Sequence, residues 1–277
     1  MSDTERPPDP APASTSAPGD GGILVDDGLD LPPPPPPESP SGNGDDEKVM
    51  SLVEHLTELR YRLIASIAAI ALCSCATLYF AGPLTRMILS TAPKVQFIAL
   101  TPMEVFFTEM KIGLLAALIL SVPVITWQIW AFIRPGLKTD EAKVLSALGP
   151  ATTVLFFMGC LFAYKIVVPT GVDFLSTFTL EGVTAQYSLD NYTSFVLFLT
   201  LAMGLIFESP VVIIFLARLG IVTAKGLAAR RKIVILGCFI VAAVITPTPD
   251  MVTQTLVAVP MWGLFEATLL TLRFLGW

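Results

Sequence analysis

Charged residues are scarce in this sequence. Asp, Glu, Lys and Arg make up only 14% of its 277 residues, whereas 53% are hydrophobic. Ordinary soluble domains carry about 25% charged residues, so the composition argues against a water-soluble fold. We therefore interpret the chain as an integral membrane protein that has the lipid bilayer as its solvent.

Groups that serve catalysis or metal binding are also few. The chain has one histidine, His55, and four cysteines that lie in apolar runs without metal-ligand spacing, so we expect no metal site and no cofactor. Walker A, HExxH and GxSxG patterns are absent from the sequence. An intramembrane enzyme would need a nucleophile or metal constellation, and we expect no enzyme. A net charge of −6 does not indicate a nucleic-acid partner either.

The first 48 residues differ from the rest of the chain. They are rich in proline, with PPPPPP at 32–37, and acidic, with DDE at 45–47. Such a tract cannot bury enough apolar surface to offset its ordering entropy. We expect residues 1–48 to be a disordered cytoplasmic tail, locally polyproline II, with a docking arm as the alternative. No basic n-region or short h-region begins the chain, so we expect no cleaved secretory signal.

Residues 49–277 contain the apolar segments of a membrane domain. A helix needs about 20 residues to cross the hydrocarbon core, and helices are expected because lipid offers backbone amides no other partner. The fifth segment has about fourteen residues, or about 20 Å of helix. We predict an all-α fold of six transmembrane helices, the last two short, at 63–81, 112–133, 144–168, 192–217, 233–246 and 255–275.

Lys and Arg indicate the orientation of these helices. They cluster before the first segment, between the second and third, and between the fourth and fifth. The positive-inside rule places these three regions, and with them both termini, in the cytoplasm. The long link at 83–111 then lies outside, and its prolines Pro83, Pro93 and Pro102 predict an ordered extracytoplasmic cap of short helices.

Two polar stretches lie at the predicted cytoplasmic face. In HLTELRYR, residues 55–62, leucines at helical spacing predict an amphipathic helix that runs into the first span, and Glu58 can pair with Arg62 four residues later. WQIWAFIRPGLKTDEAK, residues 127–143, turns at Pro135 and restarts a helix at Thr139 with Glu141 in its first turn. The plain alternatives are solvated interfacial charges and an acidic helix N-terminus.

Two further polar stretches lie within or beside the last three spans. Glu208 stands in the middle of a span in FESPV, where a carboxylate costs about 2.5–3.5 kcal/mol, so it should face a cavity, be protonated or find a partner. Pro210 should release the carbonyl oxygen of Ile206 from its usual helix hydrogen bond and leave a polar notch near Glu208. TPTPD, residues 246–250, predicts a proline-stiffened turn in which Asp250 faces the outer side, close to the sixth span. The alternative is that Asp250 caps the helix of that span.

The order HLTELRYR, FFTEMK, WQIWAFIRPGLKTDE, FESPV and TPTPD resembles the TatC family, the receptor subunits of the twin-arginine protein translocase. The resemblance covers about residues 48–277. It implies a concave bundle in the bacterial cytoplasmic (inner) membrane that binds twin-arginine signal peptides of folded cargo proteins. It also implies that the receptor recruits the single-span helices of TatB and TatA, forms homo-oligomers, and supports transport driven by the proton-motive force.

By the same resemblance, Glu58 and Glu141 recognise the paired arginines, Arg60 organises the site, and Phe132 lies beside it. A guanidinium presents a rigid fork that a carboxylate can accept, whereas lysine cannot reproduce this geometry. By the same resemblance, Glu208 lies in an intramembrane face that contacts partner helices, and Pro93 belongs to the extracytoplasmic cap. We assign Gln254 to the partner site with Glu208, and Asp250 to the cap with Pro93.

A proton-coupled small-molecule transporter is the alternative function. Glu208 and Glu266 would then relay protons. Such transporters commonly contain internal repeats, and none is evident in this sequence. This alternative also leaves HLTELRYR without a role.

Overall fold

The computed structural model describes residues 52–93, 95–136, 139–177, 186–246 and 250–276. Within helices, the side chains of residues 52–53 and 139–147 are not described. The predicted tail, residues 1–48, falls outside the described part of the chain. Its disorder and its boundary with the membrane domain therefore stay predictions.

Five helical stretches are long and apolar enough to cross a membrane. The first and second are α1 (Leu52–Tyr79) and α3 (Glu104–Ile133), and the third consists of α4 (Thr139–Phe162), a π-helical turn η2 (Ala163–Val167) and α5 (Val168–Ser176). The fourth consists of α6 (Leu189–Phe207) and α7 (Ser209–Arg218), and the fifth is α10 (Met251–Phe274). As predicted, the helix that carries HLTELRYR continues without a break into the first apolar segment.

The predicted fifth span is the helix α9 (Arg231–Ile245), whose fifteen residues do not meet the length of a candidate span. Fifteen residues are about 22 Å of helix, against about 30 Å of hydrocarbon, so the prediction of a short helix is confirmed for this segment. It is wrong for α10, which has 24 residues. α10 is longer than predicted because it begins at Met251, directly after Asp250.

The shorter elements are α2 (Ala81–Leu89), η1 (Arg134–Gly136), α8 (Ala224–Ala229) and two strands, β1 (Gln96–Ile98) and β2 (Gln186–Ser188). The strands pair in parallel, with Gln96 opposite Gln186 and Ile98 opposite Ser188. The prediction of an all-α fold therefore needs this one correction. Strands of three residues are too short for an alternating pattern to stand out in the sequence.

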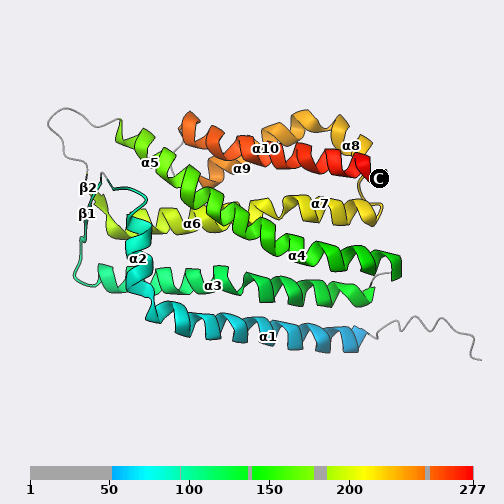
Figure 1. Ribbon diagram of the computed structural model, residues 1–277, viewed down its shortest axis with the longest axis horizontal. Coiled ribbons are helices and arrows are strands. Elements are labelled where there is room, and N and C mark those ends of the chain that lie inside the picture. Colours follow the sequence, from blue (N-terminus) through cyan, green and yellow to red (C-terminus); the bar gives the residue numbers. More distant parts are fainter. Residues whose placement is uncertain (1–51, 94, 137–138, 178–185, 247–249, 277) are drawn as a thin grey trace, which may run out of the picture. The chain divides into compact units, whose positions relative to one another are not determined.

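The helices lie alongside one another as Figure 1 shows: α1 against α3, α3 against α6, α6 against α4, and α10 against α7 and α9. α1 and α3 run antiparallel, since Thr77 near the end of α1 donates through Oγ1 to the carbonyl oxygen of Gly113 near the start of α3, at 2.7 Å. This buried hydrogen bond fixes how the two helices are aligned along their length.

Glycines allow α4 and α6 to approach closely. A Cβ on Gly159 would lie 2.5 Å from the carbonyl oxygen of Met203, and a Cβ on Gly204 would lie 2.8 Å from Sγ of Cys160. Both distances are too short for any larger residue without a shift of the helices. Small residues at such contacts are typical of membrane helices, where van der Waals packing drives association.

Candidate functional site

One face of α1 and one face of α3 form a polar cluster. On α1, residues three and four apart share a face, which brings His55, Glu58 and Arg62 into line; on α3, Gln128 and Phe132 are likewise one turn apart. The antiparallel packing of the two helices sets these faces against each other. We call these five residues the Glu58 cluster.

Arg62 is the centre of the Glu58 cluster. Its Nε donates to Oε1 of Glu58 at 2.9 Å, and its Nη2 donates to the same oxygen. Its Nη1 donates to Oε1 of Gln128, across the interface, at 3.3 Å. The predicted pair of Glu58 and Arg62 is therefore confirmed. The side chains of Glu58 and Arg62 are only 17% and 22% exposed, so the alternative of solvated charges is wrong for these two.

The second carboxylate oxygen of Glu58 is the unusual atom of the cluster. Oε2 is buried and accepts no hydrogen bond from any described residue. Most buried polar side-chain atoms have a partner, and an unpaired one costs about 1–3 kcal/mol, more when the group is charged. The described residues therefore leave the acceptor capacity of this oxygen unused.

Aromatic stacking forms a second contact between the two helices. The rings of His55 and Phe132 lie 4.3 Å apart between centroids and are tilted by only 17°. Since His55 and Phe132 each lie one helical turn from Glu58 and Gln128, this stack neighbours the ion pair. Phe132 is thus brought next to His55 and the ion pair, and its part in signal-peptide binding stays a prediction.

The other two residues expected at this site are placed differently. Arg60 is exposed, and because it stands two residues from Glu58 it points to another side of α1. Glu141 lies in the first turn of α4, which begins at Thr139 as predicted. Glu141 follows Phe132 by nine positions in the sequence, so its backbone lies near the end of α3 that carries Gln128 and Phe132. Its side chain lies outside the described part, and its contact with the site stays a prediction.

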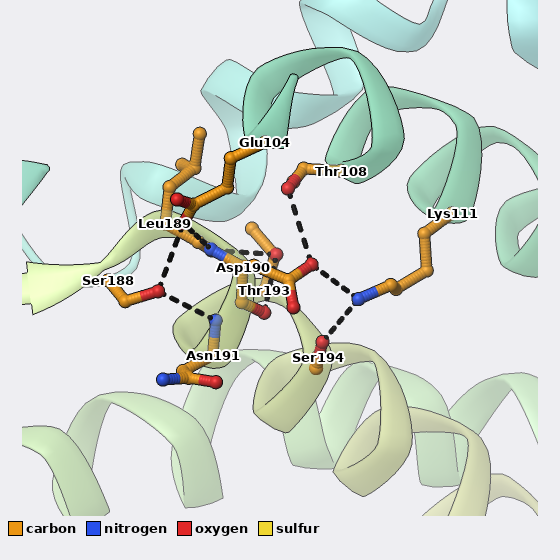
Figure 2. A network of polar contacts seen from close by, with 9 residues as sticks. All are labelled: Glu104, Thr108, Lys111, Ser188, Leu189, Asp190, Asn191, Thr193 and Ser194. Atoms are coloured by element: carbon orange, nitrogen blue, oxygen red, sulfur yellow. Dashed lines mark hydrogen bonds and ion pairs between the residues drawn. The ribbon is translucent and has the colours of Figure 1, made fainter. Parts of the chain in front are cut away.

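A second polar cluster lies at the opposite end of α3, where Figure 2 shows α3 meeting the start of α6. We call it the Glu104 cluster; its members are Glu104, Thr108, Lys111, Ser188, Asp190 and Ser194. Oε1 of Glu104 accepts from Oγ of Ser188 and from the backbone N–H of Asp190, both at 3.0 Å. Its Oε2 accepts from the backbone N–H groups of Leu100 and Thr101, the latter at 3.3 Å.

An ion pair completes the Glu104 cluster. Nζ of Lys111 donates to Oδ1 of Asp190 and, at 2.8 Å, to Oγ of Ser194. Oγ1 of the buried Thr108 donates to the same Asp190 oxygen at 3.4 Å. The cluster thus ties α3 to the first turn of α6. Sequence reasoning did not select it, although Thr101 and Glu104 have the spacing of a capping box, in which a glutamate accepts from the earlier backbone N–H.

The fourth span is interrupted at Glu208, two residues before Pro210. α6 ends at Phe207, α7 begins at Ser209, and the carbonyl oxygen of Glu208 accepts from the backbone N–H of Val211 at 3.0 Å. The side chain is half-buried. No described residue donates a hydrogen bond or an ion pair to its carboxylate. The described residues therefore do not support a structural hydrogen bond as the reason for this glutamate.

Gln254, expected to share a partner site with Glu208, instead joins two helices. Its Nε2 donates to the backbone carbonyl oxygen of Phe239 at 2.9 Å, which links α10 to α9. Arg231 and Glu266 link the same pair of helices, with Nη2 2.7 Å from Oε2. Among the described residues, no hydrogen bond connects Gln254 with Glu208.

The two residues expected in the cap have local roles. Asp250 is the N-cap of α10, since its carboxylate accepts from the backbone N–H of Thr253 at 2.7 Å. The alternative of a capping aspartate is therefore confirmed. Pro93 lies exposed in the turn between α2 and β1, which the hydrogen bond from Val95 N–H to the carbonyl oxygen of Ala92 closes at 3.2 Å.

Comparisons with a family model and with individual proteins point to the same family. The model of the family "Sec-independent protein translocase protein (TatC)" matches residues 54–260. The TatC protein of Escherichia coli K12 is 37% identical over 235 residues, covering 82% of this chain and 90% of that protein. The TatC protein of Aquifex aeolicus is 41% identical over 233 residues, covering 82% and 95%, respectively.

The fold is also similar to that of a solved TatC. The crystal structure of the twin-arginine translocase receptor TatC in the detergent DDM superposes with a TM-score of 0.71 at 38% sequence identity. The match covers 79% of this chain and 99% of that one. Together with five helices that can span a bilayer, these similarities identify a multi-pass membrane protein of protein transport.

Proposed function

This chain belongs to the TatC family of Sec-independent protein translocase proteins, and we propose that it is the receptor for twin-arginine signal peptides, with the Glu58 cluster as its binding site. The family is one of translocase receptors rather than enzymes. The observation that carries the proposal is the carboxylate of Glu58, which is mostly buried and has one oxygen that no described residue donates to.

An arginine of the signal peptide supplies the missing donor. Its planar N–H fork suits a carboxylate, and a hydrogen bond to a charged group contributes about 1.5–3 kcal/mol. A lysine ammonium carries the same charge without the fork. Glu141, in the first turn of α4 near the same end of α3, accepts the second arginine. The site therefore distinguishes paired arginines from paired lysines.

The topology follows from the same function. α9 is counted as a short span, the fifth of six along the chain, since Gln254 and the pair of Arg231 and Glu266 join it to α10. The lysines and arginines before α1, between α3 and α4, and between α7 and α9 support an inner-membrane protein with both termini in the cytoplasm. The Glu58 cluster then faces the cytoplasm, where signal peptides arrive, and the Glu104 cluster belongs to the extracytoplasmic cap.

Partner assembly uses a different part of the molecule. Glu208 interrupts the fourth span and has no described partner for its carboxylate. A polar group in hydrocarbon is stabilised by a polar partner from another helix. We place the docking of the single-span helices of TatB and TatA, and association with further copies of the receptor, on this intramembrane surface. Transport draws on the proton-motive force.

A proton-coupled transporter is less well supported. It would use Glu208 and Glu266 as relay groups, but Glu266 is held in an ion pair by Arg231 at 2.7 Å. That contact favours a structural role for Glu266 between α9 and α10.

Signal recognition is tested by titrating the purified receptor with two peptides that differ only in carrying RR or KK. We expect preference for RR, and Glu58→Gln to lower RR affinity at least about tenfold, which corresponds to about 1.4 kcal/mol. Glu109→Gln, at the other end of α3, is the matched control and should bind like the unmodified protein. Equal affinity for RR and KK in the unmodified receptor would contradict the proposal.

The partner surface is tested by Glu208→Leu, with Leu205→Met, an exposed apolar site one turn away, as control. We expect Glu208→Leu to keep RR affinity and to lose co-purification of the single-span partners. Loss of signal binding with intact co-purification would be the opposite result and would reject this division of labour.

A further inference from the structure

Arg62 donates to acceptors on two different helices. Its Nε and Nη2 go to Oε1 of Glu58 on its own helix, and its Nη1 goes to Oε1 of Gln128 on α3. A guanidinium is planar and rigid, so acceptors on two of its edges fix the plane of the group. Gln128 therefore determines the orientation of Arg62, and Arg62 determines which oxygen of Glu58 is occupied.

The way in which Arg62 contacts Glu58 matters for any second guanidinium. A fork that used both carboxylate oxygens would leave neither oxygen wholly available to a peptide. Here two N–H groups converge on Oε1, and Oε2 is left buried without a donor among the described residues. The carboxylate is thus held on one side and open on the other.

We propose that Arg62 and Gln128 are positioning residues of the signal-peptide site, which hold Glu58 so that Oε2 receives a single guanidinium. This inference rests on the proposed function and deepens it. Arg62 stays in place when the peptide binds, and a small rotation of Glu58 or of the neighbouring rings of His55 and Phe132 admits the incoming group. Because only one oxygen is open, Glu58 binds one arginine of the pair, and the other arginine needs a separate acceptor.

A competing arrangement would make Arg62 a stand-in for the peptide. In that case the peptide arginine would displace Arg62 from Oε1, and weakening Arg62 would strengthen peptide binding. If Arg62 positions Glu58, weakening Arg62 should instead weaken peptide binding. The two arrangements therefore differ in the direction of one measured change.

The test measures the dissociation constants of RR and KK peptides for the full-length receptor and its variants. Arg62→Lys keeps the charge but loses the fork, and we expect RR affinity to fall about tenfold while KK affinity changes little, so that the RR-to-KK ratio collapses. Gln128→Met removes the acceptor at nearly constant volume and should lower the ratio by a smaller factor. Gln128→Glu restores an acceptor for Arg62 and should restore the ratio.

Two controls separate positioning from a folding defect. Arg86→Lys, on the exposed surface of α2, should leave both affinities unchanged. A variant that merely folds less well lowers the amount of active receptor but not the ratio of two dissociation constants. In the double variant Arg62→Lys with Gln128→Met, we expect no loss beyond Arg62→Lys alone, because Gln128 acts through Arg62.

The outcomes are distinguishable from those of the proposed function. If Glu58→Gln abolishes RR preference but Arg62→Lys and Gln128→Met leave it unchanged, the positioning role is wrong and the receptor function stands. Stronger RR binding by Arg62→Lys also overturns it in favour of displacement. Should Arg62→Lys fail to fold, the pair Gln128→Met and Gln128→Glu decides the question by itself. If the unmodified receptor shows no RR preference, both proposals fail.

Discussion

Glu58 and Glu104 are two partly or fully buried glutamates near opposite ends of α3, and their carboxylates are paired in opposite ways. About 24 residues of α3 separate Glu104 from Gln128, the partner of the Glu58 cluster, or about 36 Å of helix. Glu104 accepts four hydrogen bonds on its two oxygens. Glu58 has one oxygen occupied by Arg62, and its other oxygen is buried without a donor among the described residues.

The donors explain what each glutamate does. Three of the four donors to Glu104 are backbone N–H groups, which belong to the loop after β1 and to the junction of β2 with α6. A carboxylate saturated by backbone donors fixes the chain and has no capacity left for a ligand. Within the part of the chain that the structure describes, the donors to Glu58 are side-chain groups of Arg62 alone. The comparison therefore assigns a structural role to Glu104 and supports the proposed binding role of Glu58.

The largest expected effect is a loss of stability when Glu104 is replaced by alanine. Glu104→Ala removes one acceptor from four donors at once, and unsatisfied donors cost about 1–3 kcal/mol each when buried. Because these donors are partly buried, we expect the free energy of unfolding to fall by about 3 kcal/mol. Thermal unfolding in detergent measures this, with Glu109→Ala as the matched control.

The folded fraction of Glu104→Ala should still prefer RR over KK peptides, since the Glu58 cluster lies at the other end of α3. A variant that unfolds at the same temperature as the control would show that the four hydrogen bonds do not stabilise the fold. A folded variant without RR preference would show that the Glu104 cluster and the Glu58 cluster do not act independently.

Glu58→Gln should have the reverse pattern. It keeps the size of the side chain and an acceptor for Arg62, so we expect the free energy of unfolding to change by less than about 1 kcal/mol. RR binding should fall at least about tenfold. Measured together, thermal unfolding and peptide titration should show that Glu104→Ala changes mainly the stability and Glu58→Gln mainly the peptide affinity. A loss of stability as large as that of Glu104→Ala would mean that Glu58 is also structural.

Local spacing made one half of each cluster predictable from the sequence. Glu58 and Arg62 are four residues apart on one helix, and Thr101 and Glu104 are three apart at the turn before α3, so both contacts are local in the sequence. The partners Gln128, Ser188 and Asp190 lie more than sixty residues away in the chain. Their contacts depend on how α1, α3 and α6 align along their length, which hydropathy does not determine.

The same distinction holds for the fold. Apolar runs predicted the helices, and Pro210 predicted a released backbone carbonyl near Glu208, where the helix is interrupted. The ladder of β1 and β2 was missed because three-residue strands joined across the chain carry no periodicity. α10 begins earlier than its apolar run because Asp250 caps it, and a cap extends a helix into polar residues that hydropathy assigns to a loop.

The smallest expected effect is that of Lys111, which sharpens the comparison within the Glu104 cluster itself. The side chains of Lys111 and Asp190 are 35% and 39% exposed, so solvent screens their attraction, and pairs of this kind contribute about 0.2–1 kcal/mol. Lys111→Met should therefore lower the free energy of unfolding far less than Glu104→Ala, and by an amount that shrinks as salt is raised. Thermal unfolding at low and high salt, with Lys165→Met on η2 as control, measures the difference. A salt-independent loss comparable with that of Glu104→Ala would show that the ion pair, and not the saturated carboxylate, holds α3 to α6.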